Sequence, residues 1–91
     1  MVNVTEGARR ELKRILLDNV DFSQARLRLM NREKGELGLG IDIEMPGDKT
    51  VEYDGLAVLV VEEKLAENLH DVTIDVDETS EGSELVILQK K

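Results

Sequence analysis

The stretch RLRLMNREKGELGLGIDIEM, residues 26–45, decides the fold of this 91-residue chain. Apolar side chains alternate with polar or small ones on both sides of a polar, glycine-marked turn at residues 31–35. This period of two predicts two half-buried strands joined as an antiparallel hairpin. The first strand is expected to bury Leu27 and Leu29. In the second strand, five apolar side chains are expected to face the core: Leu37, Leu39, Ile41, Ile43 and Met45.

A helix is predicted before this hairpin. Thr5 suits the N-cap position, and Glu6 suits the first turn, where the helix dipole favours an acid. The helix is expected over residues 6–17. Apolar residues at helical spacing give it one stripe that faces a core: Val4, Ala8, Leu12, Ile15 and Leu16. Four cations form its opposite side, which we call the basic helix face: Arg9, Arg10, Lys13 and Arg14.

A second hairpin is predicted after the first. Residues 45–48 have the composition of a turn, and a short strand is expected at residues 50–53. Asp54-Gly55 then marks a two-residue type I′ turn, which needs a positive φ at both positions. The partner strand, Leu56–Val61, is apolar throughout, as expected of a central strand that is covered on both faces.

The remaining residues predict one short helix and two more strands. The expected segments are a helix at 62–69, a half-buried strand at 72–77, a loop at 80–83 and an apolar strand at 85–88. The element order is α-β-β-β-β-α-β-β in one domain spanning residues 1–91. We therefore expect an α+β, mainly β fold with one amphipathic N-terminal helix, its mixed or antiparallel strands packed as a small sandwich or pseudobarrel.

The composition excludes several kinds of site. One Phe, one Tyr and no Trp mean that the core must be aliphatic. The absence of cysteine excludes a disulfide framework, a zinc knuckle, a thiol nucleophile and a thiolate-held cluster within these residues. The longest apolar run, Leu56–Val61, is far shorter than the ~20 residues of a membrane-spanning helix. Because no secretory signal pattern is visible either, the expected location is the cytoplasm.

The net charge of −8 is unevenly distributed. Residues 1–34 hold eight Lys or Arg and five Asp or Glu, a net charge of +3, whereas residues 35–91 hold four and fifteen, a net charge of −11. An acidic surface of this size repels the phosphates of nucleic acids. The basic portion could meet an acidic partner or the acidic portion of a second copy, but a solvated surface with uneven charge is the simpler interpretation.

Few side chains suit catalysis or metal binding. His70 is the only histidine, so it has no partner for a two-histidine metal site, and the helix dipole alone explains a histidine at a helix end. Asp75, Asp77 and Glu78 form an acidic cluster that could hold a hard cation or transfer protons. No nucleophile or phosphate-binding loop accompanies them, so a solvated strand face is the better interpretation. The sequence thus gives no support for an enzyme.

Gly38 and Gly40 stand two residues apart on one face of the predicted second strand. Glycine inside a strand usually marks a bulge or the close approach of another backbone or a ligand. The segment GELGLG is not the dinucleotide-binding fingerprint, because its spacing differs and it leads into a strand rather than a helix. The glycine pair therefore predicts a close approach of unspecified kind.

These elements, in this order, resemble the HesB/IscA-type iron–sulfur carriers over essentially the whole chain. VTEGARRELKRILL is similar to the opening helix of that family, and LRLMNREKGELGLGIDIE is similar to its L-R-L strand, G-C-S-G turn and following strand. Gly55 and the segments LAVLVV, EEKLAENL, TIDV and EGSELVIL then follow in the family's order. The resemblance implies a HesB-like fold.

In that family three cysteines hold iron or an iron–sulfur cluster, one in the G-C-S-G turn and two in a C-G-C motif after the last strand. The resemblance places Gly35 and Gly38 at the flanks of the turn and Glu36 at the first cysteine position. No C-G-C motif follows before Lys91, and Val61 replaces the family's usual Asp. Iron–sulfur clusters require thiolates in nearly all sites. Glu36 is therefore expected to be an exposed turn residue, or at most one ligand of a weakly held hard cation.

Two hypotheses about function remain. The first is a non-enzymatic relative of the carriers, an accessory or interaction protein related to iron–sulfur cluster biogenesis, with no cofactor of its own. The second is a metal- or cluster-binding carrier whose ligands are not cysteines or come from a partner. The first asks nothing of absent residues. Its partners are expected to be proteins, with a homo-oligomer allowed, and not nucleic acid or membrane.

Overall fold

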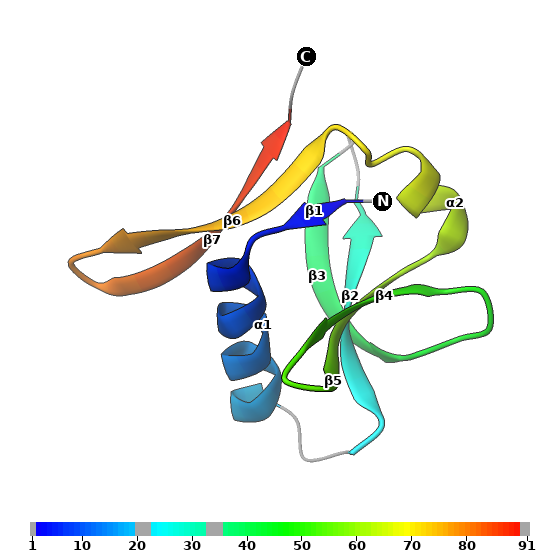
Figure 1. Ribbon diagram of the computed structural model, residues 1–91, viewed down its shortest axis with the longest axis horizontal. Coiled ribbons are helices and arrows are strands. Elements are labelled where there is room, and N and C mark those ends of the chain that lie inside the picture. Colours follow the sequence, from blue (N-terminus) through cyan, green and yellow to red (C-terminus); the bar gives the residue numbers. More distant parts are fainter. Residues whose placement is uncertain (1, 20–22, 33–35, 90–91) are drawn as a thin grey trace.

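Two sheets and one long helix enclose an aliphatic core in the computed structural model, which describes residues 2–19, 23–32 and 36–89 (Figure 1). The elements are β1 (Asn3–Val4), α1 (Glu6–Asn19), β2 (Ala25–Asn31), β3 (Leu37–Ile43), β4 (Lys49–Tyr53), β5 (Leu56–Val61), α2 (Glu63–Glu67), β6 (Val72–Thr79) and β7 (Gly82–Gln89). The predicted fold class and element order are confirmed. The short strand β1 is an addition to them.

Helix α1 begins where its cap predicts. The Ala8 N–H donates to Thr5 Oγ1 at 3.2 Å, so Thr5 satisfies one of the amides that a helix start leaves unpaired. Ala8, Leu12 and Leu16 are buried, which confirms the apolar stripe. The helix ends at Asn19, two residues beyond the prediction. Among the described residues, no helix is long and apolar enough to cross a membrane.

The larger sheet has the strand order β3-β2-β5-β4. Strands β2 and β3 form the predicted antiparallel hairpin, with Leu29 opposite Leu39. Strand β5 runs parallel to β2 and antiparallel to β4. Asp54 and Gly55 join β4 to β5 with φ values of 54° and 76°, as the predicted type I′ turn requires.

The smaller sheet has the order β1-β6-β7. Strands β6 and β7 form an antiparallel hairpin that projects from the body of the molecule, to the left in Figure 1. Strand β1 pairs in parallel with β6, with Val4 beside Ile74. A strand of two residues leaves no periodic pattern, which is why the sequence did not predict it.

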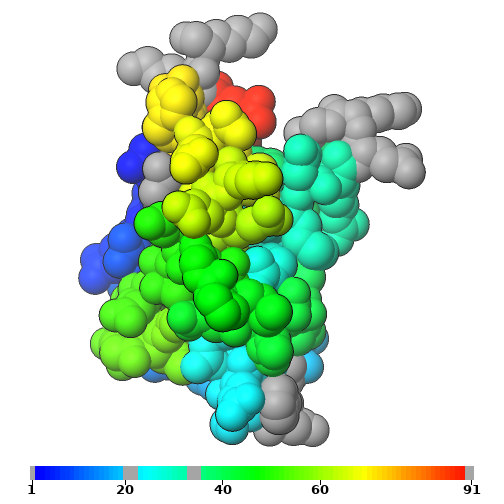
Figure 2. Space-filling model, turned by 90° about the vertical axis from the view of Figure 1, so that its right-hand side faces the viewer, coloured from blue at the N-terminus to red at the C-terminus, as the bar shows by residue number. Residues whose placement is uncertain are grey.

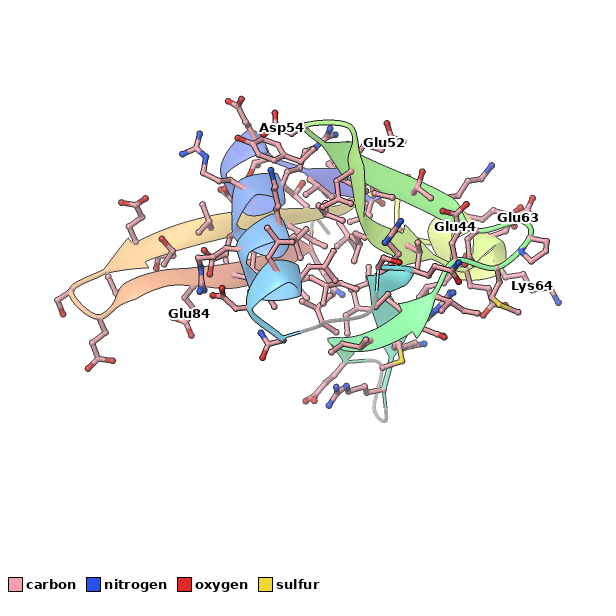
Figure 3. All side chains as sticks on the ribbon, turned by 90° about the horizontal axis from the view of Figure 1, so that it is seen from below. Glu44, Glu52, Asp54, Glu63, Lys64 and Glu84 are labelled. Carbon is pink, nitrogen blue, oxygen red and sulfur yellow. The ribbon has the colours of Figure 1, made fainter. Side chains whose placement is uncertain are left out.

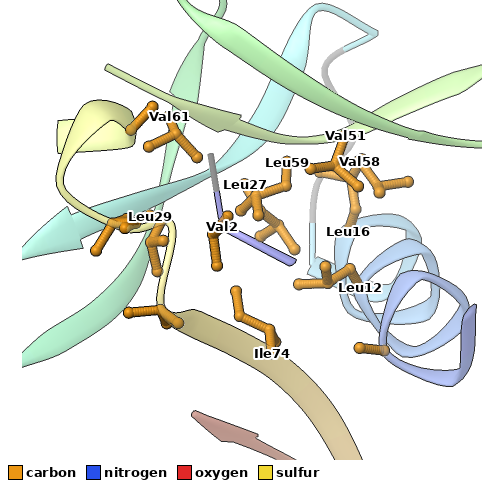
Figure 4. Close-up of a cluster of buried hydrophobic side chains, with 14 residues drawn as sticks. Val2, Leu12, Leu16, Leu27, Leu29, Val51, Val58, Leu59, Val61 and Ile74 are labelled. Carbon is orange, nitrogen blue, oxygen red and sulfur yellow. The ribbon is translucent and has the colours of Figure 1, made fainter. Parts of the chain in front are cut away.

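The buried side chains of the core cluster are all aliphatic, as the composition predicts (Figure 4). The cluster joins α1, both sheets and α2. Strand β5 lies deepest, because Val58, Leu59, Val60 and Val61 each have a relative exposure of 0%. The prediction that this strand is covered on both faces is therefore confirmed.

The expectation that β3 points its whole apolar face into the core is wrong for the second half of the strand. Leu37 and Leu39 pack against the core, but the exposed fractions of Ile41, Ile43 and Met45 are 54%, 42% and 50%. Strand β3 is an edge strand, and an open groove of about 460 Å³ separates it from α1. Helix α1 therefore does not close over this half of the strand.

Replacing Leu59 by alanine should lower the free energy of unfolding by about 3 kcal/mol, because Leu59 is fully buried in the core cluster and its truncation leaves a cavity there. Chemical denaturation measures this change. The matched control is Leu17→Ala, since the Leu17 side chain is 61% exposed, and it should shift stability by less than about 0.5 kcal/mol. Equal effects of the two substitutions would contradict the central position of β5.

Candidate functional site

The turn between β2 and β3 is the first candidate site. The Arg32 N–H donates to the Glu36 carbonyl at 2.6 Å, so the two described ends of the turn are joined by the backbone. The Glu36 side chain is exposed, as expected. Gly35, the other residue that the resemblance places in this turn, lies outside the described residues. The described part of the turn therefore presents one solvated carboxylate.

Gly38 and Gly40 are covered by side chains of β2 and of the residue that follows it. A Cβ atom at Gly38 would collide with the Arg32 side chain, and one at Gly40 would collide with the methyl group of Met30. The predicted close approach is therefore present, but the approaching groups belong to the same hairpin. The two glycines are explained by packing and do not mark a ligand site.

Arg28 forms the most buried ionic cluster of the described residues, which we call the Arg28 clamp (Arg28, Asp42 and Asp48). Its Nη2 and Nη1 atoms lie 2.6 and 3.2 Å from the two carboxylate oxygens of Asp48, and its Nε lies 2.9 Å from Asp42 Oδ2. The side chains of Arg28 and Asp48 are only 12% and 4% exposed. The clamp ties β2 to β3 and to the turn at residues 45–48.

The clamp also fixes the charge of Asp48. Hydrogen bonds from Arg28 and from the Met45 N–H hold the pKa of this carboxyl below its usual value, against the opposing effect of burial. Arg28 has a raised pKa for the same reason. Both groups are ionised at neutral pH and neutralise each other. The clamp is therefore a structural pair and has no poised acid or base.

A hollow of about 450 Å³ lies beside the clamp, between the carboxyl end of β2 and α2. Figure 2 faces this side of the molecule, with α2 in yellow-green above the green turn that precedes β4. The lining residues are Arg28, Leu29, Met30, Asn31, Glu62, Lys64, Leu65 and Asn68. Since the clamp neutralises Arg28, amides and one exposed pair of opposite charges set the chemistry of this hollow. Such groups hydrogen-bond polar ligands but do not suit a soft metal ion.

The remaining candidates do not converge. The His70 side chain is exposed, with Nδ1 3.4 Å from the Glu67 carbonyl and Nε2 3.6 Å from Asp71. Asp75 accepts hydrogen bonds from the Val76 N–H and the Thr5 hydroxyl, which together lower its pKa. Within the described ranges, no three His, Asp or Glu side chains are placed to hold a metal ion.

The acidic cluster proposed from the sequence is divided between the two faces of β6. Asp75 and Asp77 share one face, whereas Glu78 points to the other, because consecutive strand residues alternate. Asp77 lies directly opposite Glu84 of β7. Two like charges in this position destabilise the hairpin slightly and keep the strand face solvated.

The basic helix face contacts the β4–β5 hairpin of the same chain. Arg9 Nη1 donates to the Glu52 carbonyl at 3.2 Å, and Lys13 Nζ lies 3.4 Å from Asp54 Oδ2 and 5.8 Å from the centre of the Tyr53 ring. Figure 3 labels Glu52 and Asp54 on this hairpin. Arg10 donates to the Tyr53 hydroxyl, and Arg14 pairs with Glu11 and Asp18 along the helix. Part of the acidic charge that this face needs therefore comes from its own chain.

Sequence reasoning missed the Arg28 clamp. Arg26 and Arg28 occupy equivalent polar positions in the same strand, so nothing in the strand itself distinguishes them. The hairpin register does contain a signal, because it brings Asp42 beside these arginines. Asp48 lies twenty residues from Arg28 along the chain and depends on the conformation of the turn at residues 45–48.

Replacing Asp48 by asparagine should lower the free energy of unfolding at pH 7 by about 2–4 kcal/mol, because it leaves a nearly buried guanidinium with only the half-exposed Asp42 carboxylate as its counter-charge, beside the Ile43 carbonyl. The pKa of Asp48 is lowered in the folded state, so its contribution is present above the unfolded pKa of about 4 and is lost as the pH falls through the lower, folded value. Urea titrations between neutral and acidic pH should show the two proteins converging.

The matched control for Asp48→Asn is Asp54→Asn. The Asp54 side chain is 67% exposed in its ion pair with Lys13, so its loss should cost less than about 1 kcal/mol. A variant Asp48→Asn as stable as the protein itself would rule out the clamp.

Replacing Glu36 by alanine should change the free energy of unfolding by less than about 0.5 kcal/mol, because the side chain is exposed and its backbone carbonyl is retained. Thermal or chemical denaturation measures the change. A loss of several kcal/mol would mean that Glu36 has a buried partner.

No model of a known protein family matches the sequence, and no curated protein matches it. Solved structures do resemble the fold. A crystal structure of IscA with the [2Fe-2S] cluster is 22% identical, with a TM-score of 0.62 over 98% of this chain and 85% of that one. Escherichia coli SufA, which is involved in the biosynthesis of iron–sulfur clusters, is 15% identical, with a TM-score of 0.62 over 97% and 79%.

A protein from Aquifex aeolicus, solved by NMR in solution, is 21% identical, with a TM-score of 0.63 over 98% of this chain and 91% of that one. Identities this low establish a shared fold and leave the chemistry to the residues at the site. The fold that the resemblance implied is confirmed: this chain has a HesB/IscA-like fold and its 91 residues include no cysteine.

Proposed function

We propose that this chain is a non-enzymatic, IscA-like protein that acts in or near iron–sulfur cluster biogenesis through contacts with other proteins, without holding a cluster through cysteines of its own. One combination of observations supports the proposal. The fold is that of IscA and SufA over 97–98% of the chain, and the family resemblance assigns the exposed Glu36 to the first cysteine position. The scaffold is retained and the ligand at this position is replaced.

The chemistry of the described residues supports the same proposal. A cluster needs soft sulfur ligands, and the hard carboxylate of Glu36 offers neither the softness nor the number. Asp48, whose pKa is lowered, is already bound to Arg28 and to a backbone amide. Catalysis would require a positioned nucleophile or a base of tuned pKa, and the described side chains provide neither. We infer a binding protein on this basis, and its proposed location is the cytoplasm.

Anaerobic incubation with ferrous iron and sulfide, followed by desalting, tests the proposal. We expect no brown colour, no visible absorbance and bound iron far below one equivalent, because no thiolates are available to hold a cluster. A tagged protein should in contrast co-purify with components of the iron–sulfur assembly machinery when these are supplied as purified proteins.

Two outcomes would contradict the proposal. Stable uptake of iron and sulfide would favour the alternative, a carrier with ligands other than its own cysteines, and repeating the experiment with Glu36→Ala would then show whether Glu36 is one of them. Failure to bind any purified assembly protein would remove the assignment to this pathway, while the absence of a cluster would still stand.

A further inference from the structure

The sheet edges of this protein differ in how well they are protected. An edge strand exposes unpaired backbone groups, and proteins normally blunt such edges with charges, bulges or short strands. At the β3 edge, the carbonyls of Leu39 and Ile43 accept hydrogen bonds from Arg32 and Arg28 at 3.2 and 3.0 Å. At the β4 edge, the strand has five residues and a register shift after Val51. Both edges of the larger sheet are therefore obstructed.

Strand β7 has no bulge, and its single charged residue is Glu84. It extends over eight residues, pairs on one side with β6 in an unbroken register, and contains no proline, lysine or arginine. Its centre is the apolar run of residues 85–88, in which Ile87 and Leu88 are 37% and 52% exposed on opposite faces. Among the described residues, no side chain hydrogen-bonds to the backbone of this run. A long, flat and apolar edge of this kind is suited to strand pairing.

We propose that the free edge of β7 pairs antiparallel with β7 of a second copy, so that two three-stranded sheets join into one continuous sheet about a two-fold axis. A two-fold axis perpendicular to a sheet brings identical edges together in antiparallel orientation and keeps each face continuous. Leu85 and Ile87 of both copies then lie on the face that looks towards α1, and Val86 and Leu88 lie on the outer face. The apolar run of one copy therefore pairs with the apolar run of the other.

The distribution of charge does not prevent a second copy from occupying the edge. The β6–β7 hairpin carries five acids and no base over residues 72–89, but only Glu84 lies on β7 itself. Antiparallel pairing centred on Val86 or Ile87 separates the two copies of Glu84 by four to six residues along the strands, or ~13–20 Å. That distance exceeds the Debye length of ~8 Å at physiological salt, so the repulsion is screened. Figure 3 shows Glu84 on the projecting hairpin, away from the acids labelled at the opposite end.

A basic partner fits this edge less well. Its cations would find the acids Asp77, Glu78 and Glu81 near the tip of the hairpin, whereas the central four residues of the edge offer only apolar side chains and backbone groups. An uncharged apolar strand complements them, and β7 is itself such a strand. Because one strand pair buries a small area, the dimer should dissociate on dilution.

Sedimentation of the whole chain over a dilution series, with Ile87→Lys and Ile43→Lys, tests the proposal. Both isoleucines lie on edge strands, with similar exposures of 37% and 42%, so the two substitutions are matched in chemistry and setting. The unmodified protein should approach twice 10.2 kDa at high concentration. Ile87→Lys should weaken the dimer roughly tenfold or more, because the two-fold axis places two new cations at the interface. Ile43→Lys should leave dimerisation unchanged.

Cysteine cross-linking keeps the proposal testable if Ile87→Lys fails to fold. The chain has no cysteine, so Val86→Cys or Ile87→Cys introduces a single thiol beside the proposed axis, and mild oxidation should give a disulfide-linked dimer. Ile43→Cys is the control and should remain monomeric under the same conditions. A protein that stays at 10.2 kDa at the highest concentration would overturn the proposal, and so would cross-linking through Ile43→Cys alone.

Discussion

The burial of β5 on both faces is the constraint on which the rest of this structure depends. Four consecutive side chains of this strand have no exposed surface, and burying each is worth roughly 1.5–3 kcal/mol. The main core cluster, with contributions from α1 and β6, covers one face. Val60 lies beside Arg28 in the register and outside that cluster, so we infer that the Arg28 clamp and the turn at residues 45–48 cover the other face. An ion pair and an apolar strand thus depend on each other. The strand excludes water from the clamp, and the clamp holds the covering turn in place.

Periodicity and turn chemistry predicted most of the elements, because both are properties of neighbouring residues. The helix cap at Thr5, the β2–β3 hairpin and the turn at Asp54-Gly55 all follow from local rules, and the structure confirms them. The features that were missed depend on contacts between distant residues. They include the β1–β6 pairing, the Arg28–Asp48 pair and the exposure of Ile41 and Ile43. Alternation shows which side chains share a face, but only the packing of α1 decides how far along the strand that face is covered.

The candidate turn illustrates why a shared fold does not imply a shared reaction. Gly38 and Gly40 suggested a bulge or the close approach of another backbone or a ligand, yet the side chains of Met30 in β2 and of Arg32 just after it fill the space above them. A fold shared at 15–22% identity transfers the path of the backbone but not the side chains of a site, and the resemblance assigns a carboxylate, Glu36, to the family's first cysteine position. Since soft metals select their ligands by atom type, a scaffold without thiolates has the geometry of its relatives without their coordination chemistry. Function must then be sought at the surface.

Contacts within the chain bind part of the excess of cations in its first third, and the remaining charges are spread over the surface. The basic helix face binds the β4–β5 hairpin through Arg9 and Lys13, so the excess of cations in the first third of the chain is partly consumed by the fold. The acids of the β6–β7 hairpin stand along a solvated arm, where Asp77 and Glu84 lie directly opposite each other and their repulsion slightly destabilises the strand pair. A surface of this net charge repels the phosphates of nucleic acids. In the proposed dimer, recognition of the second copy depends instead on the backbone edge and the apolar run of β7. Directional hydrogen bonds act there on a surface that carries almost no charge.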